Sequence, residues 1–530
     1  MADPERSDAA PNVLFIITDQ HRADHYGFMG NRVVRTPNAD ALAARGTVFD
    51  NAWVANPVCM PNRSSIMTGR VPSAHGVVFN DRSLDWNANT FVRRFRASGY
   101  RTALLGKSHL QHGMSRNSVV EVNGEGATVA PYPSGWDGIK HFERYLEHRP
   151  DDPDDFYGFD RIELSIDHGA RVTGHHLRWA LERGGRFDQL VVPYGPEAPG
   201  TDRADGWWQL YRPPYHPDLH STSFVVDRTV DFIEEAGRQR RPWLVFASFP
   251  DPHHPMTPPG EWFDRHDPAD MELPATIDDP MADGLPHLRR LQGHDGRRQR
   301  GWVTPFGATD HDVVREAIAR TYGMIEMLDQ AVGRILEAVA AQGATDRTIV
   351  VLTSDHGDMM GEHGLMLKGF MPYRGTQQVP LVIAAPHRVA AHRAAGPPGA
   401  RAGGLACSVD LGPTLLELCG IAGYDGIQGR SLAPMLHDPQ AAVRDHVLIE
   451  DDCPPALAGG RLPDKIRTVV TDELRFTRTS LGGELLFAAD DRLEQHNLAS
   501  RHLPLRSAAV EQMMEALMAA DDLARGAPVG

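Results

Sequence analysis

Three short apolar runs in this chain each end at a cluster of ionisable residues. They are residues 13–18 (VLFIIT) before Asp19 and Gln20, residues 243–249 (WLVFASF) before Pro250 and Asp251, and residues 348–353 (TIVVLT) before Ser354, Asp355 and His356. Runs of this kind are typical of strands buried on both faces of a parallel sheet. Because ligand sites in such sheets form outside the carboxyl ends of strands, we expect the three clusters to share one site. Carboxylates suit a hard divalent cation there, although a lone Asp19 would more often cap the following helix.

A fourth segment with chemical potential surrounds Cys59. It reads NPVCMPNRSSIMTGRVPSAHGV and contains the pattern C-x-P-x-R, formed by Cys59, Pro61 and Arg63. Residues 99–110 (GYRTALLGKSHL) follow it along the chain. In this order, the two segments resemble the two signatures of the formylglycine-dependent sulfatases of the alkaline phosphatase superfamily. Asn62 departs from that pattern, since Ser or Ala is common at its position.

Further segments extend this resemblance over nearly the whole chain. They are TDQHRAD (18–24), PDPHHP (250–255), TSDHGDMMGEHGLMLKG (353–369), VDLGPTLLELCGI (409–421) and DDRLEQHNLA (490–499). The resemblance implies an alkaline-phosphatase-like α/β fold, in which helices cover both faces of a mainly parallel sheet. It also implies a smaller C-terminal domain.

In that family, the cysteine of the first signature is oxidised to Cα-formylglycine. The resemblance therefore implies a small-molecule sulfate ester as the substrate and a formylglycine-generating enzyme as a partner during maturation. The hydrated aldehyde offers two hydroxyls, one that attacks sulfur and one that later expels sulfate. The resemblance also implies one divalent metal ion, Ca²⁺ first and Mn²⁺ next. Its implied ligands are Asp19, Gln20, Cys59, Asp355 and His356.

The resemblance implies further roles around Cys59. Arg63 holds the hydrate, Lys107 contacts it, and His109 is the base that releases sulfate. Without the resemblance, Lys107 would be interpreted as a solvated surface charge, the usual state of lysine.

The remaining implied site residues act on the ester itself. His253 and Lys368 bind the sulfuryl oxygens and assist the leaving oxygen, and Asn80 orients the ester. Only one of the adjacent His253 and His254 is expected to face the site. The histidines of residues 145–220 are expected to be exposed loop residues, some of which set substrate choice.

Two other functions stay open at this point. A phosphonate monoester or phosphodiester hydrolase of the same superfamily resembles this chain at the Asp-Gln and Asp-His pairs of the metal positions. Lys107 and His109 follow the sulfatase pattern instead, and we place sulfatase first. A catalytically dead binding homologue would require the loss of site residues, and the implied set is complete.

Periodicity indicates how the remaining chain is organised. Apolar residues recur at helical spacing in 313–341 and 222–236, so strands and helices alternate as in a parallel α/β sheet. We predict a catalytic domain over 1–440, with a loop-rich insertion at 145–220. A small antiparallel α+β domain is predicted over 441–530, from four short strand-like runs and a last amphipathic helix.

Composition excludes several classes of protein. Lys plus Arg total 54 against 70 Asp plus Glu, a net charge of −16, which argues against binding to nucleic acid or to an anionic membrane. The four cysteines are too few for a disulfide framework. The start, MADPERSDAAPN, lacks the features of a secretory signal, and no run of about 18 apolar residues occurs. We therefore expect a cytoplasmic protein, with the last helix as a possible interface of a homo-oligomer.

Overall fold

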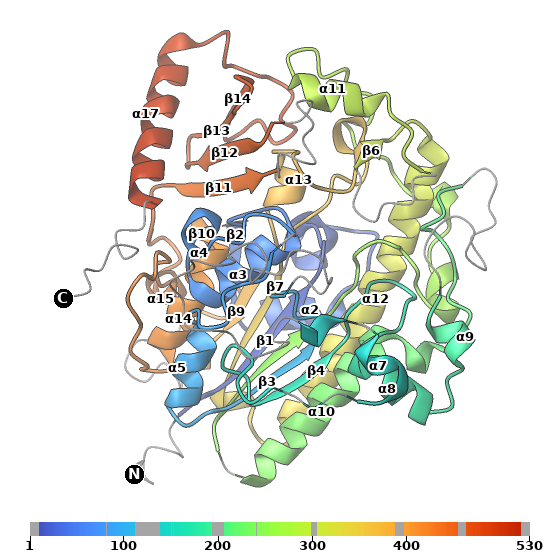
Figure 1. The fold of residues 1–530 in the computed structure, drawn as a ribbon. Helices are drawn as coiled ribbons and strands as arrows, with labels where there is room; N and C mark the ends of the chain where they lie inside the picture. Colours follow the sequence, from blue (N-terminus) through green and yellow to red (C-terminus); the bar gives the residue numbers. More distant parts are fainter. Residues whose placement is uncertain are drawn as a thin grey trace, which may run out of the picture.

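A computed structural model places an eight-stranded sheet at the centre of the protein (Figure 1). The structure describes residues 10–80, 82–111, 138–141, 143–149, 151, 153–192, 206–239, 241–297, 305–386, 397–453 and 463–520. The sheet order is β10-β2-β9-β7-β1-β5-β3-β4. The strands are β1 (Asn12–Thr18), β2 (Thr47–Trp53), β3 (Arg101–Gly106), β4 (Arg161–Leu164), β5 (Trp243–Ser248), β7 (Thr348–Ser354), β9 (Leu381–Ala384) and β10 (Ala400–Cys407). Only β9 runs antiparallel to its neighbours, so the predicted mainly parallel α/β sheet is confirmed.

The three strands predicted from apolar runs are β1, β5 and β7, and they lie side by side in the middle of the sheet. β1 pairs with β7 so that Thr18 lies beside Ser354, and with β5 so that Ile17 lies beside Ser248. The carboxyl ends of the three strands are therefore level. This register brings the ionisable residues that follow them to one edge of the sheet.

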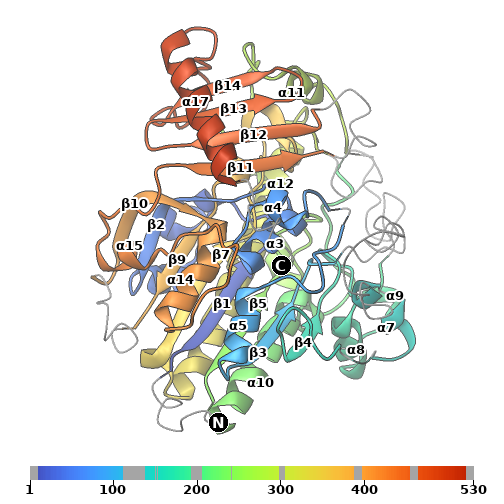
Figure 2. The same cartoon turned by 60° about the vertical axis from the view of Figure 1, so that its left-hand side comes forward.

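Helices cover both faces of this sheet (Figures 1 and 2). One face packs against α2 (Pro37–Ala43), α10 (Ser221–Gln239) and α12 (His311–Ala341), and the other against α3 (Cys59–Thr68), α5 (Phe91–Ala97) and α14 (Leu411–Leu418). Shorter elements connect them. They are α4 (Pro72–His75), α7 (Arg144–Glu147), α8 (His175–Glu182), α9 (Phe187–Leu190), β6 (Phe306–Gly307), β8 (Leu365–Met366), α11 (Pro286–Gln292), α13 (Arg374–Gln377) and α15 (Ala433–His437).

The region 145–220 is more ordered than the predicted loops. It adds β4 to the edge of the sheet beside β3, and it contains α8 and α9. Residues 150, 152 and 193–205 of this region lie outside the described residues, as do residues 1–9 and 521–530.

The C-terminal part forms a second sheet of antiparallel strands, drawn in red in Figure 1. Its strands are β11 (Val447–Asp452), β12 (Lys465–Val470), β13 (Leu474–Thr479) and β14 (Glu484–Ala488). Helix α17 (Leu503–Ala520) packs on one face through Ala509 and Met513. The predicted antiparallel α+β unit is confirmed, while its limits at 440 and 441 stay a prediction.

The C-terminal sheet holds the segment 367–378, which we call the Lys368 loop. Arg475 of β13 donates a hydrogen bond of 2.9 Å to the side chain of Gln377 and another to the backbone oxygen of Pro372. Asp451 of β11 accepts a hydrogen bond of 2.8 Å from the backbone N–H of Phe370. The last strands of the chain therefore fix the position of a loop in the catalytic part.

Asp451 has a predictable effect on stability. Burial raises the pKa of its carboxyl to about 7, and Oδ1 accepts no hydrogen bond from the described residues. Between about pH 4 and pH 7 the folded state binds a proton that the unfolded state releases, so stability falls as pH rises. Across this window, we expect the free energy of unfolding of Asp451→Asn to rise relative to that of the wild type by about 2 to 4 kcal/mol. Above pH 7 the difference should stay constant. Unfolding measured from pH 4 to 8 checks this, and a difference independent of pH would contradict it.

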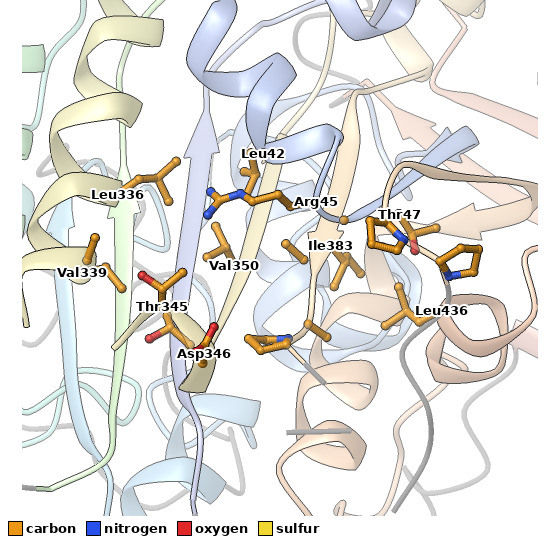
Figure 3. A pocket seen from close by; sticks show the side chains of 18 residues that line it. Leu42, Arg45, Thr47, Leu336, Val339, Thr345, Asp346, Val350, Ile383 and Leu436 are labelled. Atoms are coloured by element: carbon orange, nitrogen blue, oxygen red, sulfur yellow. The ribbon is translucent and has the colours of Figure 1, made fainter. Parts of the chain in front are cut away.

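A pocket of about 440 Å³ lies at the other end of the sheet (Figure 3). Leu336, Val350 and Ile383 contribute to its apolar wall, next to Thr348 at the start of β7. Because β7 leaves the sheet at Ser354, beside the ionisable clusters, this pocket is separate from them. Among the described helices, none has the length and apolar character that crossing a membrane requires.

Candidate active site

Four buried side chains converge at the carboxyl edge of the sheet. Asp19 follows β1, Cys59 begins α3, and Asp355 and His356 follow β7. Each offers one ligand atom, and these atoms all lie within 4.8 Å of one another. The Cys59 sulfur is 3.1 Å from His356 Nε2 and 3.8 Å from Asp19 Oδ1. The clusters after β1 and β7 thus lie together with the cysteine, whereas the carboxylate of Asp251, after β5, accepts hydrogen bonds from α10 instead.

Asn62 fixes the helix that carries Cys59. Its Oδ1 accepts hydrogen bonds from the backbone N–H of Ala55 (3.1 Å) and the hydroxyl of Ser408 (2.6 Å). Its amide N–H donates to the backbone oxygen of Asp355. The residue that departs from the family pattern thus ties α3 to the end of β7.

Three cations surround the four side chains. Arg63 lies 2.7 Å from Asp355 and 3.4 Å from Asp19, and Lys107 forms an ion pair with Asp19. Lys368 Nζ is 3.2 Å from the Cys59 sulfur and 2.8 Å from His356 Nε2. Both lysines are buried, contrary to the usual state of lysine. Two carboxylates among three buried cations leave a positive excess that suits an anionic substrate.

This charge distribution shifts the pKa values of the site. Burial alone would raise the pKa of Asp19, but Lys107 and the other cations hold it well below its usual range. Burial and Asp19 raise the pKa of Cys59, yet Lys107 and the remaining cations lower it to about 7. Burial and the surrounding positive charge hold the pKa of His253 well below its ordinary value. Perturbed groups of this kind are concentrated at functional sites.

Three histidine rings form one wall of the site. His253 stacks on His254 and on His168, with ring centroids 4.0 Å apart in both pairs. His254 is also buried, and its Nδ1 lies 3.0 Å from Gln20 Oε1. Both histidines of the PHHP segment therefore belong to the surroundings of the site, whereas only one was expected.

His168 corrects the expectation that the histidines of 145–220 are exposed. Its side chain is 15% exposed, and its Nε2 lies 2.6 Å from Lys107 Nζ. Burial, followed by Lys107, lowers the pKa of its imidazole to about 4. The signal that identifies it is β4, whose carboxyl end reaches the same edge of the sheet as the other clusters. The four-residue run RIEL is too short to predict that strand.

Three other predicted site residues lie around this centre. Gln20 directs its amide toward Asp358 and His254, and its backbone N–H donates to Asp355. The ring of His109 lies 6.1 Å from that of His168. Asn80 accepts a hydrogen bond of 2.9 Å from the backbone N–H of Met60, next to Cys59.

Comparison with known proteins decides the family. Residues 11–421 match the model of the Sulfatase family, and residues 361–502 match that of the C-terminal region of N-sulphoglucosamine sulphohydrolase. The chain belongs to the sulfatase family. It is 30% identical to an arylsulfatase from Clostridium perfringens over 439 residues. The matched stretch covers 82% of this sulfatase and 80% of the relative. The protein is thus a sulfuric ester hydrolase.

Two further similarities place this sulfatase within its superfamily. It is 26% identical to the multifunctional alkaline phosphatase superfamily protein PehA of Trinickia caryophylli, over 80% of this chain and 77% of that one. Its fold is similar to that of a phosphonate monoester hydrolase of Agrobacterium radiobacter, with a TM-score of 0.75, 24% identity, and coverage of 97% and 96% of the two chains. The predicted alkaline-phosphatase-like fold is confirmed.

Proposed function

We propose that this sulfatase hydrolyses sulfate monoesters to an alcohol or phenol and inorganic sulfate, with a formylglycine made from Cys59 as the nucleophile. One observation carries this proposal: the Cys59 sulfur lies against Lys368, His356 and Asp19 at the end of the sheet. A nucleophile at this position has charged groups on either side that stabilise an attacking oxygen and a sulfuryl group. Conversion requires a formylglycine-generating enzyme as a partner during maturation.

The donor set around residue 59 fits a divalent ion. Asp19, Asp355 and His356 supply two carboxylates and one imidazole within 4.8 Å of residue 59. Carboxylates favour Ca²⁺, our first choice, and the imidazole makes Mn²⁺ the next. Gln20, the fifth predicted ligand, would bind through Oε1, which lies 3.0 Å from His254 Nδ1. When bound, such an ion lowers the pKa of a hydroxyl at residue 59 and holds it in position.

The cations of the chain bind the ester in this proposal. Arg63 and Lys107 hold residue 59 and the sulfuryl oxygens from one side, and Lys368 holds them from the other. His253 Nδ1 faces the backbone oxygen of His254, so this nitrogen carries the proton of the neutral ring. We therefore assign the proton of the leaving oxygen to Lys368, with His253 as an acceptor beside it. His109 as the base that releases sulfate, and Asn80 as the residue that orients the ester, complete the proposed set.

A phosphonate monoester or phosphodiester hydrolase is the second candidate. His356, which resembles that branch at a metal position, lies directly on the Cys59 sulfur. Lys107 favours the sulfatase assignment instead, because a buried ammonium paired with Asp19 follows the sulfatase pattern.

Relative activity on two esters tests this order. We expect kcat/KM for 4-nitrophenyl sulfate to exceed that for a phenyl phosphonate monoester by about tenfold or more, with both measured on one metal-loaded preparation from cells that express the formylglycine-generating enzyme. A preference of several hundredfold for the phosphonate would reverse the order. Absence of turnover on both esters in fully converted protein would favour a binding homologue.

A further inference from the structure

His168 contacts both Lys107 and His253. Its Nε2 lies 2.6 Å from Lys107 Nζ, and its ring stacks on His253 at an interplanar angle of 26°. The same Nε2 is 3.7 Å from Asp19 Oδ2, the oxygen that pairs with Lys107. His168 therefore contacts the site from a side that neither β1, α3 nor β7 reaches.

The backbone imposes the position of His168. Gly169 has φ of +56°, and a Cβ there would lie 2.8 Å from the backbone oxygen of Pro255, so the segment is packed closely on the loop that carries His253. Asp167 accepts a hydrogen bond of 2.8 Å from Thr173 and pairs with Arg171 at 3.2 Å. Contacts on both sides of His168 thus hold its segment rigid.

The Lys107 ammonium needs such a contact to have a defined direction. An ammonium carries three donors on a flexible stem and behaves as a point charge. Asp19 Oδ2 and His168 Nε2 accept two of these donors, and their positions fix where the third points. We propose that His168 is a positioning residue of the sulfate-ester site, which directs the third N–H of Lys107 toward a sulfuryl oxygen. This inference rests on the proposed function, in which Lys107 contacts the ester.

Three substitutions separate the contacts of His168. Glutamine keeps an acceptor near the place of Nε2 but removes the ring, phenylalanine keeps a ring on His253 but removes the acceptor, and alanine removes both. We expect His168→Ala and His168→Phe to lower kcat/KM for 4-nitrophenyl sulfate by about 10- to 100-fold, the effect of a misplaced reacting group. His168→Gln should lose less than about fivefold, since it retains the contact with Lys107. His216→Ala, at an exposed histidine, serves as the control without effect.

A double-mutant cycle with Lys107→Ala shows whether His168 acts through Lys107. If it does, His168→Ala lowers kcat/KM by less than about threefold once Lys107 is alanine. An equal loss in both backgrounds, wild-type activity of His168→Ala, or phenylalanine performing better than glutamine would overturn the proposal.

Binding of inorganic sulfate provides a readout without turnover. In a Cys59→Ala background, calorimetric titration with sulfate should give a Kd about tenfold weaker for His168→Phe than for His168→Gln. Equal Kd values would overturn the role of His168. Failure of the proposed function gives a different result, namely full sulfatase activity of the Cys59→Ala protein itself.

Discussion

Cys59→Ala is expected to lower kcat for 4-nitrophenyl sulfate by about 10⁵-fold, the scale that removal of an enzyme's nucleophile reaches. No other described side chain at the centre offers a nucleophile in contact with both Lys368 and Asp19. Alanine is a good helix former at the first position of α3, so the fold should persist, with a shift of Tm of only a few degrees. Single-turnover and steady-state rates, together with circular dichroism, measure both effects.

The matched control is Cys407→Ala. Cys407 is also a buried free thiol, but it ends β10 and packs in the core on one face of the sheet. Its loss should lower stability and leave kcat unchanged. Mass spectrometry of the peptide that contains residue 59 adds a direct check, because an active preparation must show an aldehyde there. An intact thiol in fully active protein, or more than about a tenth of the activity in Cys59→Ala, would contradict the assignment.

Asp19→Asn is expected to lower kcat/KM by about 10³-fold and to abolish tight binding of the divalent ion. Asparagine keeps the shape of the side chain but removes the charge that faces Lys107 and Arg63, two buried cations. The free energy of unfolding of the variant should therefore also be lower than that of the wild type by about 3 to 5 kcal/mol. Metal content after desalting and the rate on 4-nitrophenyl sulfate measure the first two effects.

Two controls distinguish loss of the metal site from misfolding of the variant. Asp24→Asn removes an exposed carboxylate that pairs with Arg22 a few residues along the chain, and it should retain metal and activity. Chelation of the wild type should reproduce the loss of rate without a substitution, and Ca²⁺ or Mn²⁺ should restore it. Full activity of the chelated enzyme, at a metal content below one ion in ten chains, would refute the metal site.

The sequence predicts those strands whose side chains are buried on both faces of the sheet. β1, β5 and β7 lie in the middle of the sheet, and their continuous apolar runs follow from burial on both faces. β2 was missed because Asp50 and Asn51 interrupt its run where its side chains are half-buried near the sheet edge. β9 was missed because its apolar run, LVIA, is only four residues long.

The same distinction applies to the site. Asp19 and Asp355 follow strands whose ends the sequence marks, so their convergence was predictable, while Cys59 was placed with them by the resemblance of its C-x-P-x-R pattern. His168 reaches Lys107 through packing between loops distant in sequence, which a single sequence does not encode as a pattern. The placement of Gln20 depends on Asp358 and His254, partners that only the structure brings together.

The attachment of the Lys368 loop to β11 and β13 has a consequence for biosynthesis. A ribosome makes Asp451 and Arg475 about 390 residues or more after residue 59, at a few residues per second to a few tens. Until those strands exist, the nascent chain lacks the hydrogen bonds that fix the Lys368 loop next to the cysteine. The charged centre around residue 59 is thus complete only after the last strands of the chain have been made.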